Sequence, residues 1–125
     1  SPDWRMKKFI DAITKDLWVQ DALCGKVGAV FASGAGYGNA GGGAELTMLA
    51  MLANMAELGL LIVPLPKQTP GYAVAGLHWG PYGRSATEKM EPVGVSAEQC
   101  LAARHHGANI ARAAEALAGR TVVAK

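Results

Sequence analysis

The run Val27-Gly28-Ala29-Val30-Phe31-Ala32-Ser33 leads directly into the loop Gly34-Ala35-Gly36-Tyr37-Gly38-Asn39-Ala40-Gly41-Gly42-Gly43, and a helical pattern opens at Ala44-Glu45-Leu46. The apolar run predicts a strand over 27–33 that is buried on both faces. Glycines between a strand and a helix let backbone N–H groups approach a ligand closely, and a helix N-terminus favours negative charge. The stretch therefore predicts a strand-to-helix turn that binds a nucleotide-type cofactor.

A second strand follows the helix. The helical pattern runs over about 44–58, and Gly59 then precedes the apolar run Leu60-Leu61-Ile62-Val63-Pro64-Leu65-Pro66, which ends in prolines. A strand, a helix and a strand in this order form a βαβ unit, and such crossovers are parallel and nearly always right-handed. The chain is therefore predicted to belong to the α/β class.

The helix over 44–58 is apolar almost all round, which requires burial on more than one side. One stripe is expected to cover the sheet, and a second, methionine-rich stripe fits either a thick core or a contact with another subunit. In so small a domain we favour the subunit contact. The first stripe is Leu46, Leu49, Ala50 and Ala53, and the second is Met48, Met51, Leu52 and Met55.

Two further helices flank this unit. The first is predicted behind a cap at Ser1-Pro2-Asp3, and the last begins with the capping box formed by Ser96 and Gln99. In the first helix the inward residues are Met6, Phe9, Ile10, Ile13 and Leu17. In the last helix the inward stripe is Cys100, Ala103, Gly107, Ile110, Ala114 and Leu117, and the solvent-facing residues include Glu98, His105, Asn109 and Arg112, with His106 also expected to be solvated.

Residues 67–95 show no sustained periodicity and are interrupted by glycine and proline, as in Gly80-Pro81-Tyr82-Gly83. This pattern predicts a long loop, and long loops inside compact domains are usually functional. His78 and Trp79 lie in this loop near Tyr82, where an aromatic cover over a cofactor and a packed loop anchor are both open interpretations.

Composition excludes several classes of function. The 125 residues suffice for one domain, and a net charge of +2 without a basic block gives no reason to expect nucleic acid. Two well-separated cysteines fit reduced thiols in the cytoplasm, and the chain shows neither a secretory signal pattern nor an apolar run long enough for a membrane span. We therefore expect a soluble, cytoplasmic protein. No paired carboxylates or Cys/His cluster suggests hydrolysis or a metal, so no catalytic or metal-binding residue is assigned.

The predicted sheet is incomplete. Two parallel strands fall short of the five or so that a stable doubly wound sheet normally contains. Either a preceding half of the domain lies outside this sequence, or another chain supplies the neighbouring strands.

An ordered series of short motifs resembles the carboxyl-terminal portion of the WrbA-type NAD(P)H:quinone oxidoreductases, which are FMN proteins of flavodoxin-like fold. The series spans nearly all of residues 3–118. It comprises Met6-Lys7-Lys8-Phe9-Ile10-Asp11, Leu17-Trp18, Gly25-Lys26, Val30-Phe31-Ala32-Ser33, Gly41–Glu45, Gly59 with Ile62-Val63-Pro64, Gly80-Pro81-Tyr82-Gly83, and Ala103-Arg104 with Gly107.

The resemblance implies that residues 1–125 form the carboxyl-terminal half of one flavodoxin-like domain with a doubly wound parallel sheet, without the amino-terminal strands and phosphate loop. It implies FMN as cofactor, electron transfer from NAD(P)H to a quinone-type acceptor, and a homo-oligomer, dimer or tetramer. The expected flavin-binding residues are Ser33, Gly34, Ala35, Gly36, Tyr37 and Gly38, and the expected substrate-binding residues are Trp18 and His78. Because one wall of the site cannot hold a flavin firmly, we expect weak or no FMN binding by this chain alone.

Two other interpretations stay open. Gly36, Gly38 and Gly41 fit the dinucleotide fingerprint G-x-G-x-x-G between a strand and a helix, but Pro66-Lys67 stands where an acidic residue is expected after the next strand. The chain could also be a non-enzymatic or truncated α/β module. Titration with FMN and with NADPH separates these alternatives.

Overall fold

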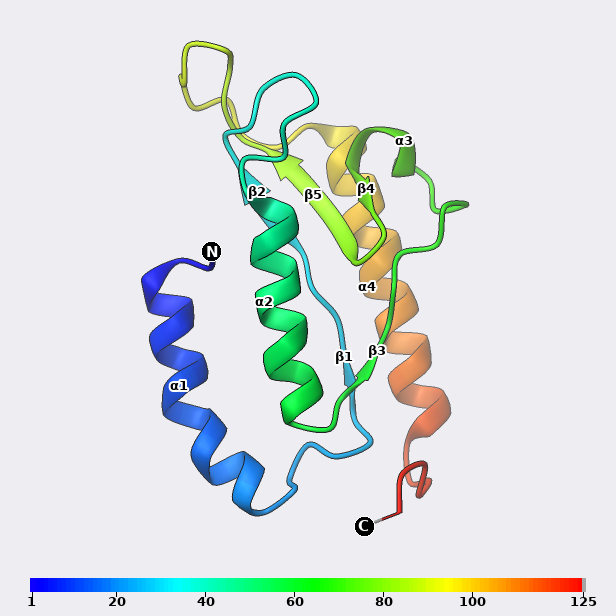
Figure 1. The fold of residues 1–125 in the computed structure, drawn as a ribbon. Coiled ribbons are helices and arrows are strands. Elements are labelled where there is room, and N and C mark those ends of the chain that lie inside the picture. Colours follow the sequence, from blue (N-terminus) through cyan, green and yellow to red (C-terminus); the bar gives the residue numbers. More distant parts are fainter. Residues whose placement is uncertain (125) are drawn as a thin grey trace.

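The fold alternates helices with short strands, and the computed structural model describes residues 1–124. In chain order the elements are α1 (Trp4–Val19), β1 (Val27–Gly28), β2 (Ala32–Gly34), α2 (Ala44–Glu57), β3 (Leu61–Ile62), α3 (Tyr72–Ala75), β4 (Gly76–Leu77), β5 (Gly80–Arg84) and α4 (Ala97–Leu117) (Figure 1). The structure is therefore of the α/β class, as the sequence predicts.

The segment 27–34 is central to the sheet, although it holds two short strands where the sequence predicts one. β1 pairs in parallel with β3, with Val27 opposite Leu61, and β2 pairs in parallel with β5, with Ala32 opposite Tyr82. β4 runs antiparallel to β5. The predicted parallel βαβ unit is confirmed, and β5 is a further parallel neighbour that comes from the predicted long loop.

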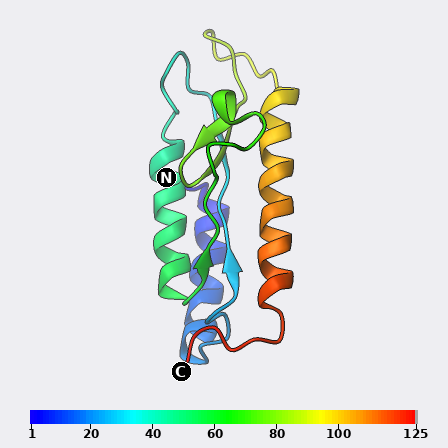
Figure 2. The ribbon, with the colours of Figure 1, turned by 90° about the vertical axis from the view of Figure 1, so that its right-hand side faces the viewer.

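Helices cover both faces of these strands. Figure 2 shows the strands between α2 on one side and α4 on the other. Helix α2 packs on β2 and β3, whereas α4 packs on β5, β1 and α3. The amide Gly25 N–H donates to the carbonyl of Gly59 and Val63 N–H donates to that of Gly28, which fixes the lower end of the sheet.

The core lies beneath α2. Val30, Ala44, Met48 and Tyr82 form a buried cluster, and Met48 is 0% exposed. The methionine-rich stripe of α2 faces this core, and the stripe that contains Leu46 and Leu49 is exposed instead. The prediction that the methionines press on another subunit is therefore wrong for Met48, because β5, unseen in the sequence, completes a core on that side.

The predicted long loop over 67–95 contains α3 and the β4–β5 hairpin, so the absence of secondary structure there is a wrong prediction. Residues Gly80–Gly83 of β5 are all buried. A Cβ on Gly80 would collide with the carbonyl of Val30, so glycine is required where β5 crosses close to the central segment. Gly80-Pro81-Tyr82-Gly83 shows no strand periodicity, because close approach of two backbones requires glycine in this strand and leaves few side chains to alternate.

Helix α4 is rotated relative to the prediction. Its buried residues are Gln99, Ala102 and His106, while Ala103 and Gly107 are exposed. The predicted capping box is confirmed: Ser96 Oγ accepts from Gln99 N–H, and Gln99 Oε1 accepts from Ser96 N–H. The inward face is therefore shifted by one residue from the predicted stripe, and the expectation of a solvated His106 is wrong.

Helix α1 packs weakly on the rest of the chain. Its N-cap is Asp3 and not Ser1, and no residue of α1 is buried. The Arg5 guanidinium, which bonds to Asp3, lowers the pKa of that carboxyl group. The central segment is correspondingly open here: Phe31 is 74% exposed, so burial of 27–33 on both faces is also a wrong prediction. No described strand pairs with this edge of the segment.

Candidate functional site

The glycine-rich loop, residues 34–43, connects the carboxyl end of β2 with the N-terminus of α2, at one end of the molecule (Figure 1). Ser33, Tyr37 and Gly38 are exposed, Gly34 and Ala35 are half-buried, and Gly36 is buried. The Tyr37 side chain is 59% exposed. The loop thus presents backbone and one aromatic ring to solvent at the carboxyl end of a parallel strand, where α/β sheets bind ligands.

Strand β5 holds this loop in place. The Tyr82 hydroxyl donates to the Gly34 carbonyl at 3.3 Å, and Ser85 N–H donates to the same oxygen at 3.0 Å. The Arg84 guanidinium donates to the Gly38 carbonyl farther along the loop. These bonds join the base and the middle of the loop to one rigid strand, so the strand restricts how far the loop can move.

Glycine is required within the loop at Gly36. A Cβ there would collide with the carbonyl oxygen of Ala40 and the amide nitrogen of Gly42. Gly38, Gly42 and Gly43 have φ values of +62°, +61° and +83°, a region that other residues rarely adopt. The turn is therefore folded back on its own backbone, with Gly38 at its outer side.

A mainly apolar groove of about 570 Å³ begins at the base of this loop, where Ser33 and Gly42 line it. The groove continues between α1, α2 and the central segment. Its lining residues include Met6, Phe9, Ile10 and Ile13 of α1, Ala29–Ala32 of the central segment, and Met51 and Met55 of α2. Asp3 is the only charged side chain among the described residues that line it. Ser33 and Gly42 therefore lie at a surface suited to an apolar or aromatic partner.

The start of α2 combines the partial positive charge of a helix N-terminus with the negative charge of a carboxylate. Its N-cap, Gly43, offers no side-chain hydrogen bond, so the amides of the first turn depend on other acceptors. The Glu45 carboxylate lies against Gly41, just ahead of the helix. This negative charge satisfies the helix dipole and opposes the approach of a phosphate to the same place. The site thus fits a flat, neutral ring better than a pyrophosphate.

The structure does not bring all the predicted site residues together within one chain. Ser33–Gly38 are consecutive residues at the end of β2 and the start of the loop. Trp18, in contrast, lies in the last turn of α1, far from the loop, and is 57% exposed (Figure 1). His78 and Trp79 form the turn between β4 and β5, at the amino end of β5, whereas the loop contacts its carboxyl end. Their rings meet edge to face at 6.4 Å.

Arg84 was not assigned to the site from the sequence, and Tyr82 was expected to close over the substrate and not to hold the loop. Arg84 and Tyr82 reach the loop through hydrogen bonds that span more than forty residues of sequence. The motif Gly80-Pro81-Tyr82-Gly83 was recognised as part of a family pattern, but only the strand pairing places its tyrosine beneath Gly34. Sequence spacing alone gives no signal for such a contact.

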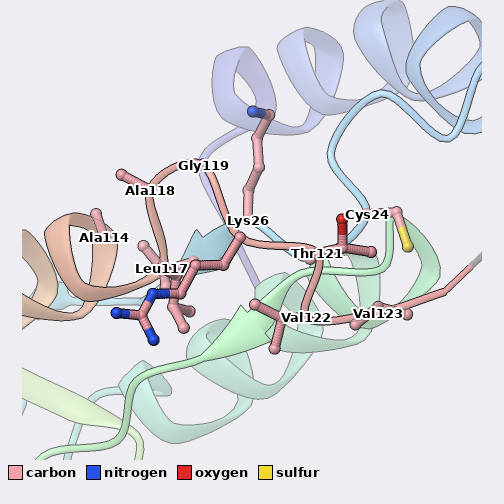
Figure 3. Close-up of a pocket in the computed structure, with 12 residues that line it drawn as sticks. Cys24, Lys26, Ala114, Leu117, Ala118, Gly119, Thr121, Val122 and Val123 are labelled. Atoms are coloured by element: carbon pink, nitrogen blue, oxygen red, sulfur yellow. The ribbon is translucent and has the colours of Figure 1, made fainter.

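A second cavity, of about 750 Å³, lies at the opposite end of the molecule, where the C-terminal segment crosses the start of β1 (Figure 3). Cys24, Lys26, Leu117 and Thr121 are among its lining residues. The Lys26 amine and the Cys24 thiol point in different directions (Figure 3). Because the described polar groups that line it do not point toward one another, this larger cavity is a weaker candidate site than the loop.

The described residues contain no cluster of three His, Cys, Asp or Glu side chains that could hold a metal ion. Cys24 and Cys100 are both free thiols. Over residues 1–124, none of the helices combines the length and hydropathy needed to cross a membrane.

Comparison with known proteins shows similarity to the NAD(P)H dehydrogenases (quinone). The chain is 36% identical over 121 residues to "NAD(P)H dehydrogenase (quinone)" of Paraburkholderia phymatum, an alignment that covers 92% of this chain and 57% of that protein. It is 36% identical to "NAD(P)H dehydrogenase (quinone) 3" of Rhizobium meliloti, over 90% of this chain and 54% of the other. It is 37% identical to "NAD(P)H dehydrogenase (quinone)" of Paracoccus denitrificans, over 93% of this chain and 57% of that protein.

The chain therefore spans little more than half the length of the curated relatives that it matches. No protein-family model matches it. The sequence resemblance to the NAD(P)H:quinone oxidoreductases is confirmed, and its extent is consistent with the carboxyl-terminal portion of a WrbA-type protein.

Proposed function

We propose that this chain forms one wall of an FMN site in a flavodoxin-like oxidoreductase that transfers electrons from NAD(P)H to a quinone-type acceptor. The observation that carries the proposal is the position of Ser33–Gly38 at the carboxyl end of β2, beside an apolar groove. The similarity to proteins named NAD(P)H dehydrogenase (quinone) supports the reaction class. A doubly wound sheet would be completed by polypeptide beyond these 125 residues.

In this proposal the chain positions the cofactor and does not carry the redox chemistry. FMN, when bound, supplies hydride acceptance and electron transfer. The amides of the exposed residues Ser33, Tyr37 and Gly38 would donate hydrogen bonds to the edge of the ring, and Tyr37 would offer it an aromatic face. Tyr82 and Arg84 would hold the loop in the binding geometry through their bonds to Gly34 and Gly38.

The residues present fit the ring of FMN and not its phosphate. The Glu45 carboxylate lies at the start of α2, and the nearby Arg84 guanidinium is already bonded to the Gly38 carbonyl. The phosphate would therefore be held by polypeptide outside this chain. From this division we expect the 125 residues alone to bind FMN only weakly.

Substrate access and assembly are part of the same proposal. Trp18 and His78 are exposed but remote from the loop of their own chain, so they would meet a substrate at the loop of another subunit. The exposed apolar stripe of α2, which contains Leu46 and Leu49, offers a surface for such a homo-oligomer. A cytoplasmic location would suit the two free thiols.

A dinucleotide-binding site is the less favoured alternative. The fingerprint Gly36, Gly38 and Gly41 lies between a strand and a helix, as that site requires. However, a pyrophosphate would have to lie at the helix N-terminus, where the carboxylate of Glu45 repels it. A module without enzymatic activity is the other alternative, and the exposed Ser33–Gly38 surface argues against it.

The test is an NMR titration of the ¹⁵N-labelled chain with FMN and, separately, with NADPH. FMN is expected to bind weakly and to shift the amides of Ser33–Gly38. Tyr37→Ala should weaken this binding several-fold, because the exposed ring is lost. The matched control is Leu46→Ala, which removes an equally exposed side chain nearby and should leave FMN binding unchanged.

Four outcomes would contradict the proposal. Shifts confined to the cavity near Cys24 and Lys26 would move the site elsewhere. Shifts with NADPH alone would favour the dinucleotide site, and no shift with either ligand at millimolar concentration would favour the inert module. Tight, stoichiometric FMN binding would contradict the claim that the site is only half complete.

A further inference from the structure

A further groove, of about 410 Å³, lies where β5 leaves the sheet and the chain runs on into α4. Its lining residues come from α3, the end of β5, the segment 86–95 and the start of α4. None of them lines the groove beside α1 or the cavity near Cys24, so this is a separate surface. Its volume falls in the range of about 300–1,000 Å³ that small-molecule pockets occupy.

Valine side chains form most of its walls, and we call it the valine groove. Val74, Val93 and Val95 are exposed, and the buried Ala86 completes the apolar lining. The backbone is fixed here, because Val93 N–H donates to the Ser85 carbonyl. Covering three exposed valines removes apolar area from water, so the valine groove favours a ligand with an apolar body.

Three polar side chains line the valine groove, and two of them are already engaged. Ser96 Oγ and Gln99 Oε1 both accept backbone N–H groups in the capping box of α4. The third is Arg84, the only charged side chain among the described residues that line this groove. In a mainly apolar pocket the few polar groups fix the orientation of a ligand, so here that orientation would depend on Arg84.

The Arg84 guanidinium carries a charge that the described chain does not neutralise. It has five N–H donors, yet among residues 1–124 it makes one hydrogen bond, to the Gly38 carbonyl. The ion pairs found in this part of the chain lie at α1 and do not include it. Its Nε is buried and has no acceptor among the same residues. A partly buried cation without a counter-charge is costly, so an anion beside it would be stabilising.

The nearby carboxylates of the described chain do not pair with Arg84. Glu88 and Glu91 are the acidic residues that follow it most closely in sequence, and both are exposed. The Glu91 carboxylate accepts from the Thr87 hydroxyl. Glu98, in the first turn of α4, is also exposed, and none of the three lines the valine groove. The described lining therefore carries one positive charge and no negative charge.

We propose that the valine groove binds a small, mainly apolar carboxylate. Its apolar body would lie against the valines, and its carboxylate would accept hydrogen bonds from Arg84. Guanidinium and carboxylate are matched in geometry and in charge. A single cation favours a monoanion, since a phosphate dianion would keep a net negative charge beside apolar walls. This site is separate from the flavin wall and does not rest on the proposed function.

The test is an NMR titration of the ¹⁵N-labelled chain, without flavin, with 2-naphthoate and with 2-naphthamide. The two probes share one ring system and are nearly equal in size, but only naphthoate is charged at neutral pH. Naphthoate is expected to shift the amides of Ala86, Val93 and Val95. It should bind about tenfold more tightly than naphthamide, because a hydrogen bond between charged groups is stronger. Inorganic phosphate, titrated separately, should cause no such shifts.

Three variants separate the charge from the walls. Arg84→Gln should reduce the preference for naphthoate to about one, since it removes the cation. Val93→Ser should weaken both probes and keep the preference, because it removes apolar surface and leaves the backbone bond to Ser85 in place. The matched control is Arg112→Gln, which removes the same charge from an exposed position of α4 outside the groove and should change the binding of neither probe.

The ratio of the two affinities distinguishes a binding role of Arg84 from a structural one. If Arg84 acted only by holding the glycine-rich loop at Gly38, its loss would weaken both probes alike and leave the ratio unchanged.

Equal affinities for the two probes in the unchanged chain would overturn the proposal, as would shifts confined to other surfaces or the absence of saturable shifts. A preference that survives Arg84→Gln, or one that Arg112→Gln also removes, would contradict the role of Arg84. Tighter binding of phosphate than of naphthoate would contradict the choice of a monoanion. Because flavin is absent and the reporting amides lie outside Ser33–Gly38, failure of the FMN titration leaves this result unaffected.

Discussion

The two edges of the central segment differ sharply, although they belong to the same few residues. The edge that faces β3 and β5 is closed: Val30 and Tyr82 are buried there, and α4 covers it with Ala102 and His106. The other edge is open, and Phe31 and the apolar face of α1 border a groove. The difference indicates that the burial of a segment depends on which neighbours the polypeptide provides, and not on the local sequence alone.

This comparison predicts that alanine substitutions at Met48 and at Phe9 differ most in how far they lower the free energy of unfolding. Met48→Ala should lower the free energy of unfolding by about 2–5 kcal/mol, because the side chain is fully buried. Phe9→Ala removes a larger side chain at the open edge and should cost less than about 1 kcal/mol. Urea denaturation of both variants measures the contrast, and equal losses would show that the groove is closed in solution.

A second contrast lies within β5 on the closed side. Gly80→Ala places a methyl group against the backbone carbonyl of Val30, which cannot move away easily, and should cost about 1–3 kcal/mol or more. Gly83→Ala meets only the side chain of Val95, at 2.9 Å, which can rotate, so its cost should be smaller. Thermal denaturation of the pair ranks them, and the reverse order would be inconsistent with β5 lying close to the central segment.

The third prediction concerns His106, which is 2% exposed on the closed side and whose two ring nitrogens have no hydrogen-bonded partner among residues 1–124. Burial lowers the pKa of His106 below its usual 6.5, and the backbone of Val30 partly opposes that shift. Below about pH 6.5 the unfolded chain therefore binds a proton that the folded chain resists. The free energy of unfolding should fall as the pH is lowered from that value towards the pKa of the folded state.

His106→Gln should remove this part of the pH dependence, since glutamine is polar but does not titrate. The control is His105→Gln, one residue along the same helix at a half-buried position, which should leave the acid-side decline in place. Denaturant midpoints between pH 5 and pH 7 measure both variants. A decline that persists in His106→Gln would assign the effect to other groups.

Much of the fold could be predicted because its signals are local. The helix at 44–57, the parallel pairing of β1 with β3 and the capping box at Ser96 each follow from residues within a short window. The glycine-rich loop was also identified from sequence, and the structure places it at the carboxyl end of a parallel strand. These features depend on backbone conformation and periodicity, which a short stretch encodes.

The errors share a different cause. β5 was missed because Gly80 satisfies a close contact with the backbone of Val30, Gly83 lies against the Val95 side chain, and neither glycine contributes to a hydrophobic alternation. The burial of His106 and Met48 was assigned incorrectly because both depend on where β5 lies. For the site, the sequence supplied the loop, but the bonds of Tyr82 and Arg84 to it span residues that only strand pairing brings together.

By itself, the sequence determined the α/β class, the order of the main helices, the glycine-rich turn and the resemblance to quinone oxidoreductases. Only the tertiary structure decided which stripe of α2 is buried, that β5 supports the loop, and that one edge of the central segment is open. The physical reason is that helices and turns are fixed by bonds between nearby residues. Burial and strand pairing, in contrast, depend on partners that are distant in the chain or lie beyond these 125 residues.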